Sequence, residues 1–108
     1  MRVVHYVTLA GADPVGKYLD DLPDREAAPI TAARAAVEAY GLNAAGVSTR
    51  QLRGRLWELR VGAHRLLFVA LAGGTVVLLH AYRKASQRAP RGEIETAIAR
   101  MKQVCAHE

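Results

Sequence analysis

The chain has 108 residues and a mass of 11.7 kDa, which fits one compact domain and excludes a multidomain enzyme. It carries 15 Lys and Arg against 10 Asp and Glu, and its 51% of hydrophobic residues is too high for a disordered basic tail. No apolar run approaches the roughly 20 residues of a membrane-spanning helix and the first residues lack the order of a signal peptide, so we expect a cytoplasmic protein without membrane contact.

The positive charge gathers in the second half of the chain. Residues 1–49 hold four basic and six acidic residues, whereas residues 50–102 hold eleven basic and three acidic ones. Clustered arginines most commonly neutralise phosphate, so this half is predicted to bind a polyanion, with nucleic acid as the leading candidate. The alternative is a solvated basic face that serves solubility.

The first half predicts a strand followed by two helices. Residues 3–9 are β-branched and apolar enough for a strand. Asp13 and Pro14 suit the N-cap and the first position of a short helix with apolar residues at helical spacing. A second helical stripe runs over residues 30–40, and residues 42–51 are predicted to be a loop.

The second half changes to the period of strands. Gly62-Ala63 and Gly73-Gly74 have the composition of two-residue hairpin loops and predict antiparallel strands over about 52–61, 64–72 and 75–84. Pro90 then begins a C-terminal helix with an apolar stripe. The expected fold is α+β, with an N-terminal strand, a helix hairpin, a three-stranded antiparallel meander and a C-terminal helix.

The hairpin register decides which side chains share a face of the sheet. Two-residue loops place Arg60 opposite Arg65, and Arg65 opposite Tyr82. One face is then wholly apolar and should be covered by the helix pair, whereas the C-terminal helix should cover the apolar end of the other face. The apolar face comprises Trp57, Leu59, Val61, Leu66, Phe68, Ala70, Val77, Leu79 and Ala81.

Polar side chains collect at one end of the second face. Two arginines directly across adjacent strands repel each other unless an anion lies between them. Together the polar residues supply anion-binding cations, a candidate general base and candidate general acids, which favours phosphodiester chemistry. They are Glu58, Arg60, Arg65, His80, Tyr82 and Lys84.

Each of these residues also has a purely structural interpretation. Glu58 and Arg60 could belong to an ion-pair network on an exposed sheet, and His80 and Tyr82 could be ordinary packing residues. A second set of arginines could position phosphates or simply be solvated charges. This set is Arg53, Arg55, Arg83, Arg88 and Arg91.

The histidines and the single cysteine predict neither a metal site nor a disulfide. His5, His64 and His107 lie on different elements without the spacing of metal ligands, and Cys105 has no partner. No cofactor is expected. Trp57 is predicted to pack in the core rather than to stack on a nucleic-acid base.

The order of the strand motifs resembles the RelE/HigB superfamily of toxins from bacterial type II toxin–antitoxin systems, and within it the phage-derived HigB-like branch. The resemblance covers nearly all of residues 1–108 as one toxin domain and is specific after Leu52. It implies a cytoplasmic endoribonuclease that cuts mRNA, usually on the ribosome. A partner antitoxin, often a helix-turn-helix protein, would hold it inactive in a hetero-oligomer. The motifs are Leu52–Arg60, His64–Phe68, Val77–Lys84, Ala89-Pro90 and Glu93–Ala97.

The resemblance also implies which residues act. The family arginine of the second meander strand maps onto Arg65, and the basic residues that close the third strand map onto Arg83 and Lys84. The chain departs from RelE-type relatives, which have lysines near the position of Glu58 and a tyrosine in the C-terminal segment. Ala85 also stands where relatives of this branch commonly have a lysine.

The implied reaction is attack of the RNA 2′-hydroxyl on the adjacent phosphorus without a metal. Arg65 and Arg60 would stabilise the anionic intermediate. Glu58 or His80 would take the 2′ proton, and Lys84, His80 or Tyr82 would assist the leaving oxygen.

Two other functions remain open: a non-catalytic RNA- or ribosome-binding module, and a toxin with another target. The antitoxin should dock on the basic face or along the apolar rims of the helices.

Overall fold

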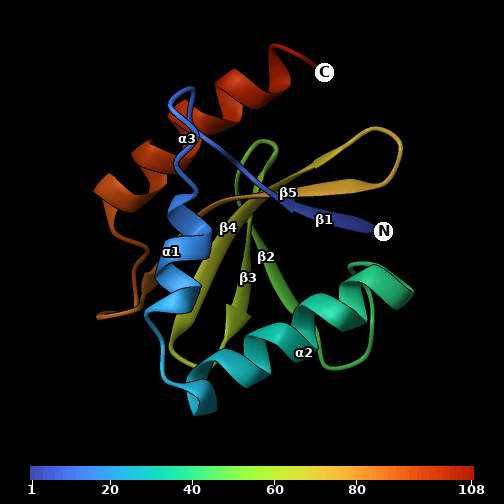
Figure 1. The fold of residues 1–108 in the computed structure, drawn as a ribbon, viewed down its shortest axis with the longest axis vertical. Helices are drawn as coiled ribbons and strands as arrows, with labels where there is room; N and C mark the ends of the chain where they lie inside the picture. Colours follow the sequence, from blue (N-terminus) through green and yellow to red (C-terminus); the bar gives the residue numbers. More distant parts are fainter.

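A computed structural model describes residues 1–108 as three helices packed on one five-stranded sheet (Figure 1). The strands are β1 (Arg2–His5), β2 (Ser48–Arg53), β3 (Leu56–Val61), β4 (His64–Leu71) and β5 (Thr75–Arg83). The helices are α1 (Pro14–Asp20), α2 (Asp24–Tyr40) and α3 (Arg91–Cys105). The strand order is β1-β5-β4-β3-β2, with β1 parallel to β5 and the other pairs antiparallel. The expected α+β class is confirmed.

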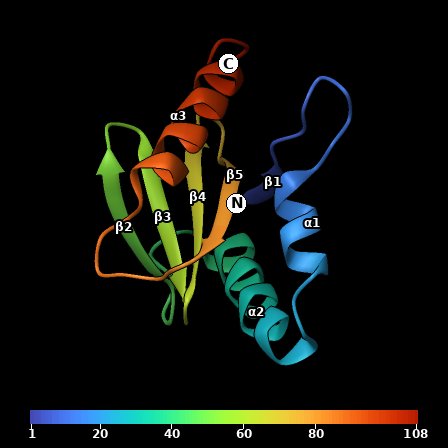
Figure 2. The same cartoon turned by 90° about the vertical axis from the view of Figure 1, so that its left-hand side faces the viewer.

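The sheet separates two apolar layers (Figure 2). On one face α1 and α2 pack Val15, Ile30 and Val37 against the sheet. On the other face Ala97 of α3 packs against a cluster that includes Leu56, Leu67, Val69 and Leu79. The prediction that the C-terminal helix covers the second face is therefore confirmed. None of the helices is long and apolar enough to cross a membrane.

Residues 48–53 form strand β2, so the prediction of a loop over residues 42–51 is wrong at its end. The predicted strand 52–61 is in fact a hairpin that turns at Gly54, whose φ of 55° is a left-handed conformation that glycine adopts without strain. β2 lies at the sheet edge and is mostly polar, so it lacks the alternation that identifies a half-buried strand. The strand brings Arg50 opposite Glu58.

The predicted register is correct at one end of the sheet and wrong at the other. Arg60 pairs with Arg65, and Arg65 pairs with Tyr82, as expected. Between Leu67 and Phe68 a β-bulge shifts the pairing of β4 with β5 by one residue, so Leu71 pairs with Thr75. The loop between these strands therefore has three residues, numbers 72–74, rather than two.

This shift exchanges side chains between the two faces of β5. Val76 and Leu78 pack in the layer under α1 and α2, whereas Val77 and Leu79 pack under α3, which is the reverse of the prediction. A shift of one residue turns every side chain between the bulge and the β4–β5 loop to the opposite face. From the bulge to the end of β5 the faces agree with the prediction, with Ala81 under the helix pair.

Two element boundaries and the position of Trp57 also differ from the sequence prediction. β1 ends at His5, and Leu9 is fully exposed. α2 begins at Asp24 and continues through Pro29. Trp57 is 36% exposed because it pairs with Gln51 on the edge strand, outside the apolar cluster that the helices cover.

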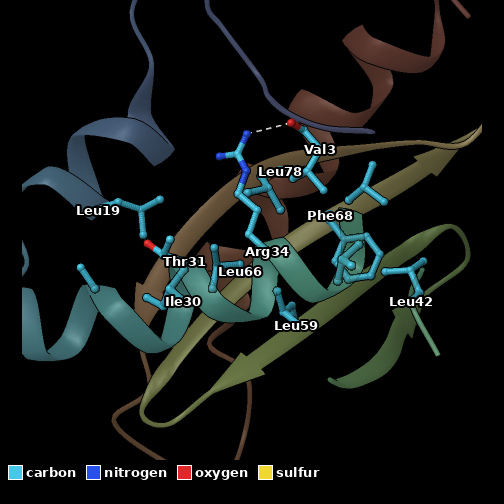
Figure 3. Close-up of a pocket in the computed structure, with 13 residues that line it drawn as sticks. Val3, Leu19, Ile30, Thr31, Arg34, Leu42, Leu59, Leu66, Phe68 and Leu78 are labelled. Carbon is cyan, nitrogen blue, oxygen red and sulfur yellow. Dashed lines mark hydrogen bonds between the residues drawn. The ribbon is translucent and has the colours of Figure 1, made fainter. Parts of the chain in front are cut away.

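A cavity of about 80 Å³ lies between α2 and the sheet (Figure 3). Eleven of its 13 lining residues are hydrophobic. At its rim Arg34 donates from Nη2 to the carbonyl oxygen of Val3 at 2.8 Å (Figure 3). Space of this kind costs the lining atoms dispersion contacts, so the packing of α2 on the sheet can be improved.

Replacing Val37, which lines this cavity and is 2% exposed, with Ile should stabilise the protein. The added methyl group fills space without exposing a polar atom, and we expect the free energy of unfolding to rise by about 0.5–1 kcal/mol. Denaturant titration measures the change, with V37A as the control that should lower it. A less stable V37I protein would show that the cavity has no room for the group.

Candidate active site

A polar pocket lies on the α3 side of the sheet, where β2, β3, β4 and β5 face the segment that joins β5 to α3. In Figure 2 this segment crosses the strand ends toward β2 before α3 begins. The strands contribute Arg50, Glu58, Arg60, Arg65 and Tyr82 to the lining. The joining segment contributes Lys84, Ser86, Gln87, Arg88 and Ala89.

Arg60 and Arg65 lie opposite each other on β3 and β4, and both line the pocket. The guanidinium of Arg65 donates from Nη1 to the carbonyl oxygens of Gly62 at 2.8 Å and His64 at 2.9 Å. The guanidinium of Arg60 donates from Nε to Ser48 Oγ at 3.2 Å. Backbone and hydroxyl acceptors thus hold two like charges in adjacent positions without neutralising either charge.

Glu58 lies in the lining of this pocket and is only 1% exposed. Its Oε1 lies 3.3 Å from Nη2 of Arg50 and 3.8 Å from Nε of Arg65. The same oxygen accepts no hydrogen bond. A buried carboxylate requires compensating charge, which the two arginines supply, yet an oxygen without a hydrogen bond keeps the capacity to take a proton.

Tyr82 is 7% exposed and lies opposite Arg65. Burial raises the pKa of the Tyr82 phenol, and the neighbouring Glu58 carboxylate adds to the shift. The phenol therefore keeps its proton at neutral pH and can act as a hydrogen-bond donor in the pocket.

His80 does not line this pocket. Its Nε2 lies 3.1 Å from Glu93 Oε2, and its Nδ1 lies 3.2 Å from Nη1 of Arg100, which also donates to the carbonyl oxygen of Leu79 at 2.9 Å. Arginine can only donate, so Nδ1 accepts and Nε2 carries the proton toward Glu93. His80 pairs with Leu67 in the predicted register and lies on the face that α3 covers, so both ring nitrogens fasten that helix to β5.

Arg88 alone of the second arginine set lines the pocket. Arg83 binds Glu26 of α2. Arg55 binds Glu108 at 2.8 Å, which lowers the pKa of Glu108 to about 2. Arg91 is an exposed residue that binds Glu95 at 2.9 Å, and Arg53 lies with Arg55 beside α3 in another depression.

Arg50 is the pocket residue that the sequence analysis missed, because residues 42–51 were predicted to be a loop. Gly54-Arg55, between two short runs compatible with strands, was the available signal for a hairpin. With Arg50 included, five cationic side chains surround one carboxylate: Arg50, Arg60, Arg65, Lys84 and Arg88. The pocket therefore suits an anionic group. No three His, Cys, Asp or Glu side chains lie close enough together to hold a metal ion.

Comparisons with known proteins add two findings. The model of the family "Phage derived protein Gp49-like (DUF891)" matches residues 17–102. The fold is similar to a chain in the crystal structure of the archaeal RelE-RelB complex from Pyrococcus horikoshii OT3, with a TM-score of 0.63 and 19% sequence identity. This match covers 82% of the present chain and 97% of the archaeal chain. A search of curated proteins finds no significant match.

The structural match concerns the fold, and the family match concerns the sequence. The structural match, at 19% identity, establishes that the strands and helices follow the RelE arrangement. The family match spans most of the chain, including the strands that line the pocket. The chain therefore belongs to the phage-derived Gp49-like family and has a fold similar to that of the archaeal RelE-RelB chain, in agreement with the resemblance of its strand motifs.

Proposed function

We propose that the protein is the toxin of a type II toxin–antitoxin system and that it is an endoribonuclease that cleaves mRNA. The observation that carries this proposal is the buried Glu58 carboxylate, with an oxygen that accepts no hydrogen bond, in a pocket lined by five cations. The fold supports it, since the solved relative is half of a RelE-RelB complex. The partner would be an antitoxin, with a helix-turn-helix protein as the expected type.

The pocket is suited to one phosphodiester of a single-stranded RNA. Arg60 and Arg65 approach from neighbouring strands, so a phosphate between them relieves their repulsion and replaces the missing counter-charge. Lys84 and Arg88 lie on the joining segment, where they would contact the adjacent phosphates. Such contacts make the affinity for RNA depend strongly on salt.

The reaction requires only charge stabilisation and two proton transfers. The 2′-oxygen forms a bond to the adjacent phosphorus while the bond from phosphorus to the 5′-oxygen breaks. Glu58 takes the 2′ proton, and Tyr82 or Lys84 delivers a proton to the leaving oxygen. Arg60 and Arg65 stabilise the oxygen anions of the intermediate. The products are a 2′,3′-cyclic phosphate and a 5′-hydroxyl.

Geometry favours Glu58 over His80 as the general base. Glu58 lines the pocket, whereas Glu93 and Arg100 bind both ring nitrogens of His80. A bound phosphate would compete with Glu58 for Arg50 and Arg65, which would leave the carboxylate free to contact the 2′-hydroxyl.

A module that binds RNA or the ribosome without cleaving it is the second candidate. The contacts of Glu58 with Arg50 and Arg65 favour this alternative, because they also give the carboxylate a purely structural role. Cleavage on the ribosome in the cytoplasm is the finer form of the first candidate. Assays with purified protein in the presence and absence of ribosomes separate these possibilities.

Replacing Arg65 with Ala should lower the rate of RNA cleavage by about 10²- to 10³-fold, since it removes one of the two donors to the anionic intermediate. Growth arrest on expression and single-turnover cleavage of a labelled RNA measure the effect. R25A, an exposed arginine on α2, is the matched control and should cleave like the wild type. Full toxicity of R65A would contradict the proposed site.

Replacing Glu58 with Gln tests the general base. Cleavage should fall by about 10²- to 10⁴-fold, whereas RNA binding should persist because the cations remain. H80Q should loosen α3 and lower the melting temperature, yet retain cleavage within about tenfold of the wild type. A large loss of cleavage in H80Q together with an active E58Q would assign the base to His80.

Attack by the 2′-hydroxyl predicts that the protein cannot cut DNA. An mRNA with a single 2′-deoxy nucleotide at the mapped cleavage position should resist cutting there while neighbouring positions remain sensitive. Primer extension on translated mRNA locates the position. Cleavage at the deoxy position would exclude the proposed reaction.

A further inference from the structure

Four polar side chains form a network on the sheet face opposite the pocket. His64 is 3% exposed, with Nδ1 at 2.6 Å from the hydroxyl of Tyr18 and Nε2 at 2.9 Å from Oε1 of Glu26. The same Glu26 oxygen accepts a hydrogen bond from Nη2 of Arg83. Glu26 of α2 therefore binds the first residue of β4 and the last residue of β5 at one point.

The network satisfies its own polar groups. Hydrogen bonds from Arg83 and His64 hold the pKa of Glu26 below its usual value, so the carboxylate is charged and accepts from both. This arrangement fits the tautomer in which His64 Nε2–H donates to Glu26 and the Tyr18 hydroxyl donates to Nδ1. No atom of the network faces the RNA pocket.

The position of the network in the sheet links it to that pocket. His64 and Arg83 are paired across β4 and β5. The next residue after each is a pocket cation, namely Arg65 and Lys84. Successive side chains of a strand point to opposite faces, so a group that fixes His64 and Arg83 on one face also fixes the backbone that carries the pocket cations on the other.

The β3–β4 turn provides a second link. The guanidinium of Arg65 donates to the carbonyl oxygens of Gly62 and His64, at 2.8 and 2.9 Å. The backbone N–H of Lys84 donates to the carbonyl oxygen of Ala63 at 2.7 Å. Residues 62–64 thus support the Arg65 side chain and the Lys84 backbone, and the side chain of His64 holds this turn against α1 and α2.

We infer that Glu26 is a positioning residue for the phosphate site: through His64 and Arg83 it fixes the β3–β4 turn, and thereby sets where the cationic groups of Arg65 and Lys84 meet a phosphodiester. This inference rests on the proposed RNA-cleaving function. Glu26 touches neither RNA nor the reacting atoms, and its contribution is geometric. Well-packed apolar side chains would hold the helices to the sheet at least as well as this partly exposed network does, whereas directional hydrogen bonds define one arrangement of the turn.

The expected consequence is a loss in kcat rather than in RNA binding. A displacement of about 1 Å in a catalytic group can cost about 10²-fold in rate, whereas the cations still attract the RNA backbone from a displaced position. E26Q keeps the shape of the side chain but loses the charge that holds two donors. We expect kcat to fall about 10- to 100-fold, with KM changed by less than about threefold.

E38Q is the matched control. Glu38 lies on the same helix, its side chain is 45% exposed, and it pairs only loosely with Arg34 at 3.7 Å. The two variants make the same change in net charge, so a general electrostatic effect on RNA would appear in both. Y18F is the second test variant, since it loosens His64 from α1 without changing any charge. Kinetics are measured well below the melting temperature of each variant, so that a lower stability alone does not change kcat.

Nuclear magnetic resonance tests the geometry without reference to catalysis. Hydrogen exchange of the Lys84 backbone amide, which donates to Ala63 in the turn, should accelerate in E26Q and Y18F but not in E38Q. Unchanged exchange in E26Q, or equal kcat in E26Q and E38Q, would overturn the inference. If the wild type cleaves no RNA while exchange still accelerates in E26Q, the proposed function fails and the positioning of the cations by Glu26 stands.

Discussion

The placement of like charges on adjacent strands is the constraint on which the rest of the site depends. The backbone pairing of β3 and β4 fixes Arg60 and Arg65 directly opposite each other, so two positive side chains leave the sheet side by side. The protein places one buried carboxylate, Glu58, near Arg50 and Arg65 and leaves the pocket with an excess of positive charge. The folded sheet therefore holds uncompensated positive charge, which a bound anion would neutralise.

The β-bulge lies where the polar end of the sheet meets its apolar end. At the pocket end of β5, Tyr82 faces the pocket and Ala81 faces the helix pair. In the first part of β5, before the bulge, apolar residues occupy both faces, which α2 and α3 cover from opposite sides. His80 lies on the same face as Tyr82, and it binds Glu93 and Arg100 of α3 instead of lining the pocket.

The two faces of the sheet cooperate at the end where the cations lie. A network of Tyr18, Glu26, His64 and Arg83 holds the helix pair to the residues that directly precede Arg65 and Lys84. On the pocket face, the segment from Lys84 to Ala89 completes the lining before α3 begins. The sheet and the β3–β4 turn thus support Arg60 and Arg65, whereas an irregular segment supplies Lys84 and Arg88.

The α+β class, the helix stripes and the pairing of Arg60 with Arg65 could be predicted from the sequence, because they depend on local periodicity and on the turn at Gly62-Ala63. The order of the strand motifs indicated the family. The role of Arg50 could not be predicted, because the polar edge strand β2 becomes a strand through pairing with β3 and has no pattern of its own. The environment of His80 could not be predicted either, because its partners Glu93 and Arg100 reach it only when α3 docks on the sheet. The contact of Glu26 with His64 and Arg83, 38 and 57 residues away in sequence, likewise arises only when the helices dock on the sheet.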